Sequence, residues 1–171
     1  RMVMAGQWFI PLERMNPYLG RSNAGLDSDL DALSAYIGSL QKPDPPPIPA
    51  ALLASVRRGK ALFESPKTGC LSCHPPPLYT DSGRRDAGGR FVLHDVGTGR
   101  TGSRYDTPSL LGLARTEPYL HDGRARSLEE VLTRHNTGDR HGRTSHLSRD
   151  EARALATYLK HLQPRSAAKA R

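Results

Sequence analysis

The alternation of hydrophobic and polar positions along the chain predicts four amphipathic helices and no convincing strand. The first spans residues 28–40 and takes Ser28 as its N-cap, because apolar residues recur there every three or four positions. The second follows a proline-rich stretch, ends near Ser65, and carries one face made of Leu52, Val56, Gly59 and Phe63. A glycine within that face indicates a close approach by another backbone.

Two further helices are marked by their N-terminal caps. Residues 127–130 read Ser-Leu-Glu-Glu and residues 148–151 read Ser-Arg-Asp-Glu, and each sequence is a capping box. The last helix then carries an apolar face of Ala152, Leu155, Leu159 and Leu162. We expect Gly59 and Phe63 to cross it near Tyr158 and Leu162, since a small and an aromatic residue permit close packing.

Proline and glycine divide the rest of the chain. The prolines of residues 43–49 cannot continue a helix and predict a stiff, extended linker. Residues 75–126 are rich in glycine and proline, and an irregular segment of that length is expected only where it wraps around something. Residues 165–171 are expected to form a frayed tail.

The sequence Cys70-Leu71-Ser72-Cys73-His74 indicates which group this segment could wrap around. Two thiols three positions apart, followed at once by a histidine, are the motif that attaches c-type haem. At that spacing both sulfurs reach the two vinyl groups on one porphyrin edge, and His74 reaches the iron. A zinc site would need further ligands, and no second cysteine pair exists. A redox dithiol would need a βαβ context, which the prolines that follow do not supply.

The second iron ligand is expected on the third helix. Leu128, Val131, Leu132 and His135 stand at i, i+3, i+4 and i+7, so His135 shares the apolar face of that helix. Because a haem would lie in the same core, we predict that His135 ligates the iron opposite His74. The iron would then be six-coordinate with two histidines.

Other ligands remain open at this point. His121, a methionine or an open coordination position are the alternatives, and the methionines at positions 2, 4 and 15 all precede the linker. The remaining histidines occur in polar or loop contexts and are expected to be solvated: His94, His141, His146 and His161.

Composition and charge fit a small helical protein that depends on a cofactor. Of the 171 residues only 36% are hydrophobic and 6% aromatic, so a haem would supply much of the core. The net charge of +8 predicts a basic surface that steers an acidic redox partner, whereas no helix combines basic and aromatic residues as nucleic-acid binding would require. No apolar run approaches the roughly 20 residues that cross a bilayer. No signal peptide is recognisable, and haem attachment to such a motif places the protein in a bacterial periplasm.

Several motifs in order resemble the C-terminal haem domain of the bacterial di-haem cytochrome c peroxidase and MauG family. The resemblance runs from about Arg57 to Gln163 and rests on these segments: Gly59-Lys60-Ala61-Leu62-Phe63, Gly69 to His74, His94-Asp95-Val96-Gly97-Thr98-Gly99, Thr107-Pro108-Ser109-Leu110 and Pro118-Tyr119-Leu120-His121-Asp122-Gly123. It implies one covalent haem c and a distal ligand at the position of His135, where the family often has methionine. Calcium is possible by the same resemblance, but no residue pattern supports it.

A weak internal repeat adds a boundary. Asp29 to Gln41 parallels Glu151 to Gln163, with Leu33, Tyr36, Ile37 and Leu40 matching Leu155, Tyr158, Leu159 and Leu162. We therefore interpret residues 1–42 as the helical tail of a preceding, degenerate or truncated cytochrome-like domain, residues 43–49 as the linker and residues 50–164 as an all-α cytochrome c haem domain.

Two functions follow from this organisation. An electron-transfer domain would pass electrons between its haem and a redox partner protein or a neighbouring haem domain. The alternative is part of a di-haem peroxidase or MauG-like oxidoreductase whose other haem domain lies outside this chain. Catalysis at haem needs an open or displaceable iron position, and a blocking histidine favours electron transfer for this segment.

Overall fold

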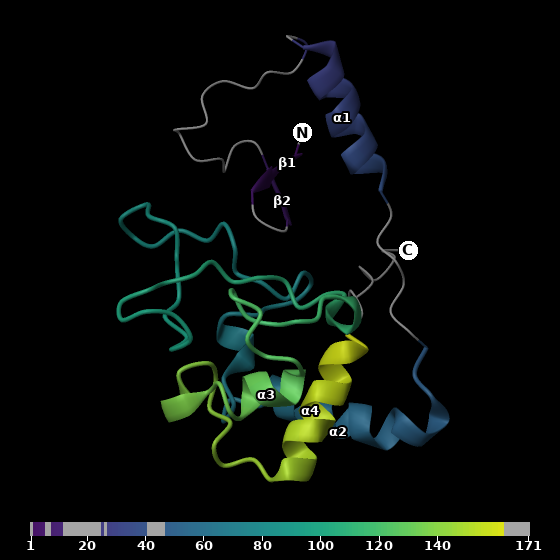
Figure 1. Cartoon of the computed structure of the whole chain (residues 1–171), viewed down its shortest axis with the longest axis vertical. Helices are drawn as coiled ribbons and strands as arrows, with labels where there is room; N and C mark the ends of the chain where they lie inside the picture. Colours follow the sequence, from purple (N-terminus) through teal and green to yellow (C-terminus); the bar gives the residue numbers. More distant parts are fainter. Residues whose placement is uncertain (1, 6–7, 12–24, 26, 41–46, 163–171) are drawn as a thin grey trace. The chain divides into compact units, whose positions relative to one another are not determined.

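A computed structural model describes residues 2–5, 8–11, 25, 27–40 and 47–162 (Figure 1). The contacts within the chain divide it into two compact units, Arg1–Pro43 and Asp44–Arg171. Each unit is described by itself. The predicted tail at 165–171 and most of the predicted linker at 43–49 lie outside the described residues.

The first unit contains a hairpin and a helix. Strands β1 (Met2–Ala5) and β2 (Trp8–Pro11) pair antiparallel, with Met2 opposite Pro11. This hairpin was not predicted, although the valine of the first strand and the isoleucine and aromatic residues of the second favour strands. Helix α1 (Ser28–Ser39) is confirmed, but its N-cap is Asp27 and not Ser28. The Asp27 carboxylate accepts hydrogen bonds from the N–H groups of residues 29 and 30, which a charged oxygen at a helix N-terminus does well.

The second unit is built on three helices, as the all-α prediction required. Helix α2 (Leu53–Glu64) follows a single 3-10 turn, η3 (Ala50–Leu52), and ends at Ser65 because Pro66 disfavours a helical conformation there. Helix α4 (Arg149–Lys160) packs against both α2 and the short α3 (Leu128–Leu132) (Figure 1). The described residues of this unit contain isolated β-bridges only.

Helices α2 and α4 cross at very close range at Gly59. A Cβ placed on Gly59 would overlap the carbonyl oxygen of Ala154 and lie 2.6 Å from Cβ of Tyr158. The predicted crossing of Gly59 near Tyr158 is therefore confirmed. One turn later the Phe63 ring, which is 1% exposed, packs on the rings of Tyr158 and Tyr79 with centroids 5.6 Å and 5.9 Å away. These aromatic contacts form the centre of the core.

The predicted caps of α3 and α4 are present in different degrees. At α4 the capping box is complete: the Ser148 hydroxyl accepts from the N–H of Glu151, and the Glu151 carboxylate accepts from the N–H of Ser148. At α3 the Ser127 hydroxyl accepts from the N–H of Glu130, whereas the Glu130 carboxylate accepts from Arg126 instead. Only half of the capping box at Ser127 forms, and α3 ends after five residues.

Residues 75–126 contain no α-helix, as predicted, and are held by polar contacts. One 3-10 turn, η5 (Leu113–Arg115), and bridges such as His94 with Tyr105 interrupt the loops. Hydroxyl groups tie the segment together: Ser109 donates to the carbonyl of Leu78, and Thr80 donates to that of Thr107. Such side-chain contacts replace the backbone ladder that helices or strands would provide.

Gly59→Ala is expected to destabilise the protein, although alanine is the better helix former. Because the new Cβ meets backbone atoms of α4, the helices must move apart, which costs about 1–3 kcal/mol. The free energy of unfolding from denaturant titration measures the effect. Ala61→Leu, on the exposed part of the same helix, is the matched control and should change little. Equal effects of both variants would contradict the crossing.

Glu151→Gln is expected to lower thermal stability at neutral pH and to matter less in acid. The N–H of Ser148 and then Arg58, 3.1 Å away, lower the pKa of Glu151 to about 2. A carboxylate with a lowered native pKa stabilises the fold above its unfolded pKa, and this stabilisation is lost as pH falls from about 4.5 towards 2. The difference in melting temperature between the two proteins should therefore shrink from pH 5 to pH 3.

The control for this variant is Glu64→Gln at the exposed end of α2. Its pair with Lys60 spans 3.9 Å at the surface and should contribute little. A constant difference between wild type and Glu151→Gln across the acid range would contradict the assigned role of the Glu151 charge.

Candidate functional site

The two cysteines lie on one turn directly after α2. Gly69 adopts a left-handed conformation with φ of 71°, and the 3-10 turn η4 (Cys70–Ser72) begins there. The N–H groups of Cys73 and His74 both reach the carbonyl of Cys70, at 3.4 Å and 3.0 Å. Both thiols are free and half-buried, and burial raises the pKa of Cys70. The turn thus places two thiols that form no disulfide beside an imidazole.

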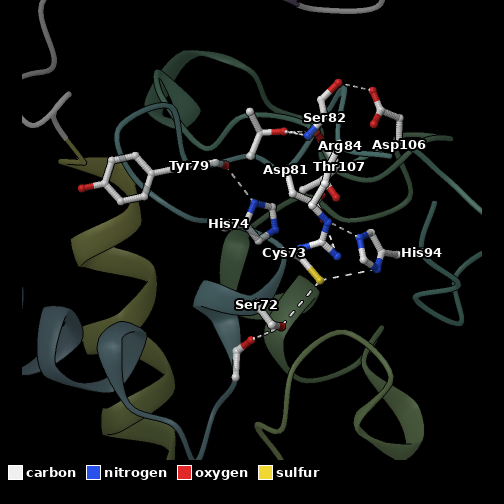
Figure 2. A network of polar contacts seen from close by, with 12 residues as sticks. Ser72, Cys73, His74, Tyr79, Asp81, Ser82, Arg84, His94, Asp106 and Thr107 are labelled. Atoms are coloured by element: carbon white, nitrogen blue, oxygen red, sulfur yellow. Dashed lines mark hydrogen bonds and ion pairs between the residues drawn. The ribbon is translucent and has the colours of Figure 1, made fainter. Parts of the chain in front are cut away.

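His74 is held in one tautomer. Its Nδ1 lies 3.0 Å from the carbonyl oxygen of Tyr79, and since a carbonyl only accepts, Nδ1 carries the proton (Figure 2). Nε2 then keeps its lone pair. The ring is buried, and burial lowers the pKa of His74 to about 4, so the imidazole is neutral at physiological pH. A neutral imidazole with its other nitrogen hydrogen-bonded to a carbonyl is the usual state of a histidine ligand to a metal.

A polar network lies on the Cys73 side of the turn (Figure 2). The His94 ring bridges Cys73 Sγ at 3.5 Å and Asp81 Oδ2 at 3.0 Å. Burial acts to raise the pKa of Asp81, but hydrogen bonds from Thr107 and His94 lower it on balance. The side chain of Asp81 is only 1% exposed, and that of His94 is 25% exposed. The predicted solvated position of His94 is therefore wrong, because the loop 75–126 folds back on the cysteine turn.

His135 does not lie on a helix. Helix α3 ends at Leu132, and the capping residue Thr133 leaves the helical conformation with φ of −124° and ψ of −83°. The predicted helix through His135 is thus too long, although Leu128, Val131 and Leu132 are buried as expected. The half-buried His135 ring has an Nε2 that is buried without a hydrogen-bond partner among the described residues.

His141 is the histidine whose ring faces His74. The two ring centroids lie 6.4 Å apart with their planes inclined at 39°. The His141 ring is half-buried, its Nδ1 has no hydrogen-bond partner in the described part of the chain, and burial lowers its pKa. The predicted solvated position of His141 is therefore also wrong.

The remaining candidates lie elsewhere or are exposed. The exposed His121 stacks on Tyr105 with centroids 4.5 Å apart. His161 is half-buried, and its Nδ1 donates to the carbonyl of Thr157 at 2.9 Å. Met2 and Met4 belong to strand β1 in the other unit, and Met15 lies outside the described residues.

The donor set fits a c-type haem better than a bare ion. Two free thiols, a neutral histidine with an available nitrogen and two buried, unpartnered ring nitrogens match a porphyrin attached at one edge and ligated by imidazole. In the described part of the chain no three Cys, His, Asp or Glu side chains converge as a bare metal site requires. The zinc and calcium alternatives thus gain no support from it.

Comparison with known proteins points to the same group. No protein-family model matches the chain. It is 33% identical to the hydrazine synthase subunit gamma of Kuenenia stuttgartiensis over 78% of its own length and 48% of that protein. It is 39% identical to the methylamine utilization protein MauG of Methylorubrum extorquens over 52% of its length and 27% of MauG. It is also 30% identical to a cytochrome-c peroxidase of Denitromonas iodatirespirans, over 52% of its length and 33% of that enzyme.

The fold is likewise shared with a solved structure. Hydrazine synthase from Kuenenia stuttgartiensis, pressurized with xenon, superposes with a TM-score of 0.63 and 31% identity over 78% of this chain and 55% of that one. The chain is related to the MauG and cytochrome c peroxidase proteins. The predicted resemblance and the cytochrome c-like fold are thereby confirmed, and a haem-binding oxidoreductase domain is the common feature of this group.

The chain spans about half or less of the length of these curated relatives.

Within the described residues, no helix has the length and apolar character needed to span a membrane.

Sequence reasoning missed the position of His141. The segment 136–146 is polar and irregular, so no periodicity distinguishes His141 from the other loop histidines. Its place depends on contacts with residues 66–68, more than 70 positions away. Gly142, directly after His141, was the only sequence signal that another backbone segment approaches closely there.

Proposed function

We propose that this chain is a c-type haem electron-transfer domain, with one haem attached covalently to Cys70 and Cys73 and ligated by two histidines. The observation that carries the proposal is the turn of residues 69–74, which presents two free thiols beside a neutral His74 whose Nδ1 is fixed by Tyr79. A bound haem supplies a centre that gains and loses one electron. Cys70, Cys73 and His74 would hold this haem, and a histidine of the segment 135–141 would be the second ligand of its iron.

Electron transfer is favoured over catalysis because two histidines are available as a second ligand of the iron. A haem that activates peroxide needs an open or displaceable position on its iron. Here two half-buried histidines, His135 and His141, each have a buried ring nitrogen without a hydrogen-bond partner among the described residues, and the ring centroid of His141 lies 6.4 Å from that of His74. The net charge of +8 suits an acidic redox partner. Haem attachment through a Cys-X-X-Cys-His motif supports a periplasmic location.

The alternative function is a part of a di-haem peroxidase or MauG-like oxidoreductase. Its support is the identity with MauG and a cytochrome-c peroxidase, of which the chain covers 27% and 33%. The first unit supplies a second observation through the internal repeat. Leu33, Tyr36 and Leu40 of that unit are 52%, 62% and 58% exposed, whereas their counterparts Leu155, Tyr158 and Leu162 are 0%, 7% and 3% exposed.

This contrast supports residues 1–42 as the tail of a preceding cytochrome-like domain. In the second unit the corresponding face of α4 is covered by α2. An apolar helical face of that kind is normally buried against another helix. A neighbouring haem domain with an α2-like helix would cover α1 in the same way.

Covalent attachment is tested by extraction. Protein produced with a haem-maturation system should keep its haem in acidified acetone, because thioether bonds survive that treatment. Cys70→Ser combined with Cys73→Ser should release all haem and lower the melting temperature, since binding of the native state by a ligand stabilises it. Extraction of the haem from wild type would contradict the proposal.

The spin state separates the two functions. A bis-histidine iron should give a low-spin ferric spectrum, a low reduction potential and little peroxide turnover. Optical and electron paramagnetic resonance spectra, with a peroxidase assay, measure these properties. A high-spin ferric protein that turns over peroxide would favour the oxidoreductase alternative instead.

A further inference from the structure

We propose that His141, and not His135, is the second axial ligand of the haem. This inference rests on the proposed function and assigns one residue of its site. Its basis is the distance between the His141 and His74 rings, the hydrogen bonds that hold the loop carrying His141 and the connection of this loop to the cysteine turn.

The separation of the two rings matches shared ligation. A metal–nitrogen bond to imidazole is about 2 Å long, and a ring centroid lies about 1 Å behind its ligating nitrogen. Two imidazoles on opposite sides of one metal therefore have centroids about 6 Å apart. The centroids of His74 and His141 are 6.4 Å apart. His74 keeps Nε2 available, because its Nδ1 donates to the carbonyl of Tyr79.

The His141 backbone is held by a buried amide. Asn136 is 6% exposed, and its Oδ1 accepts from the N–H of His141 at 2.8 Å. Its Nδ2 donates to the carbonyls of His141 and Gly142 and lies 2.7 Å from the Thr144 hydroxyl. The Thr144 hydroxyl in turn donates to the carbonyl of Leu132, at the end of α3. The loop is therefore fixed although it forms no regular element.

The same loop is fastened to the segment that leads into the cysteine turn. The N–H of Arg143 donates to the carbonyl of Thr68 at 2.8 Å, and its guanidinium donates to the carbonyls of Pro66 and Lys67. Gly142 has a φ of 76°, and a Cβ there would lie 3.1 Å from the oxygen of Thr68. Both histidines are thus placed by one continuous set of contacts, with His74 four residues beyond Cys70 and His141 one residue before Gly142.

His135 has weaker support as the ligand. His135 does not share the apolar face of α3, since this helix ends at Leu132. Its backbone N–H donates to the carbonyl of Glu130 at 2.9 Å, so the residue follows the end of that helix closely. Its buried Nε2 has no hydrogen-bond partner among the described residues. Ligation of the iron would satisfy this nitrogen, and so would a hydrogen bond to a polar group of the haem. The experiment therefore compares the two histidines directly.

The test uses the full chain, matured with haem, in three single variants: His141→Gly, His135→Gly and His146→Gly. His146 is exposed in the same segment and is the matched control. We expect His141→Gly to give a high-spin ferric spectrum, a large gain in cyanide affinity and recovery of the low-spin spectrum on addition of imidazole. His135→Gly and His146→Gly should stay low-spin. A low-spin His141→Gly protein, or a high-spin His135→Gly protein, would overturn the assignment.

A second variant covers the case in which His141→Gly fails to fold. His141→Met should show the near-infrared charge-transfer band of methionine bound to ferric haem and a raised reduction potential. An unchanged bis-histidine spectrum in His141→Met would overturn the assignment. Failure of this ligand assignment can be distinguished from failure of the proposed function, because acid–acetone extraction of wild type tests haem attachment and does not depend on the second ligand. A high-spin wild type would overturn both.

Discussion

The fold of the second unit depends on the absence of a side chain at Gly59. With no Cβ there, α4 approaches α2 so closely that Ala154 and Tyr158 occupy the space. The approach brings Phe63 against Tyr158 and buries the end of α2. From that end Thr68 donates its hydroxyl to the carbonyls of Leu62 and Ser65, at 2.6 Å and 3.0 Å, and the cysteine turn begins two residues later. The crossing of α2 and α4 therefore positions the start of the cysteine turn.

Polar contacts continue what the crossing begins. The carbonyl of Thr68 accepts from Arg143, and the carbonyl of Tyr79 accepts from His74, so backbone oxygens of loops define both sides of the candidate site. This arrangement explains how a chain with 36% hydrophobic residues orders a long irregular region. Buried donors and acceptors that are paired stabilise modestly, but each would cost about 1–3 kcal/mol if left without a partner. The loops are therefore specified by satisfaction of polar groups more than by apolar burial.

The sequence was informative wherever the structure is set by local periodicity. The apolar faces of α2 and α4 and the complete box at Ser148 follow from residues within one or two turns of each other, and the crossing at Gly59 was expected from the small and aromatic residues on those two faces. It failed where a competing local contact or a distant one decides. Asp27 replaces Ser28 as the cap of α1, since its carboxylate accepts from the N–H groups of residues 29 and 30, and α3 ends at Leu132, where Thr133 leaves the helical conformation. His141 is placed by contacts made across the whole unit.

The position of the second ligand decides which chemistry the domain supports. A histidine at the end of a helix over residues 128–135, about two turns long, would be placed by apolar packing alone. His141 is instead placed by the Asn136 amide, which accepts through its oxygen and donates through its nitrogen. Displacing His141 would be costly, because moving its backbone would break the hydrogen bonds that the buried Asn136 makes with the N–H and carbonyl of His141. If His141 is the second ligand, as proposed, a bound haem would keep both iron positions occupied. The hydrogen bonds of Asn136 are therefore a further reason for proposing electron transfer rather than peroxide chemistry.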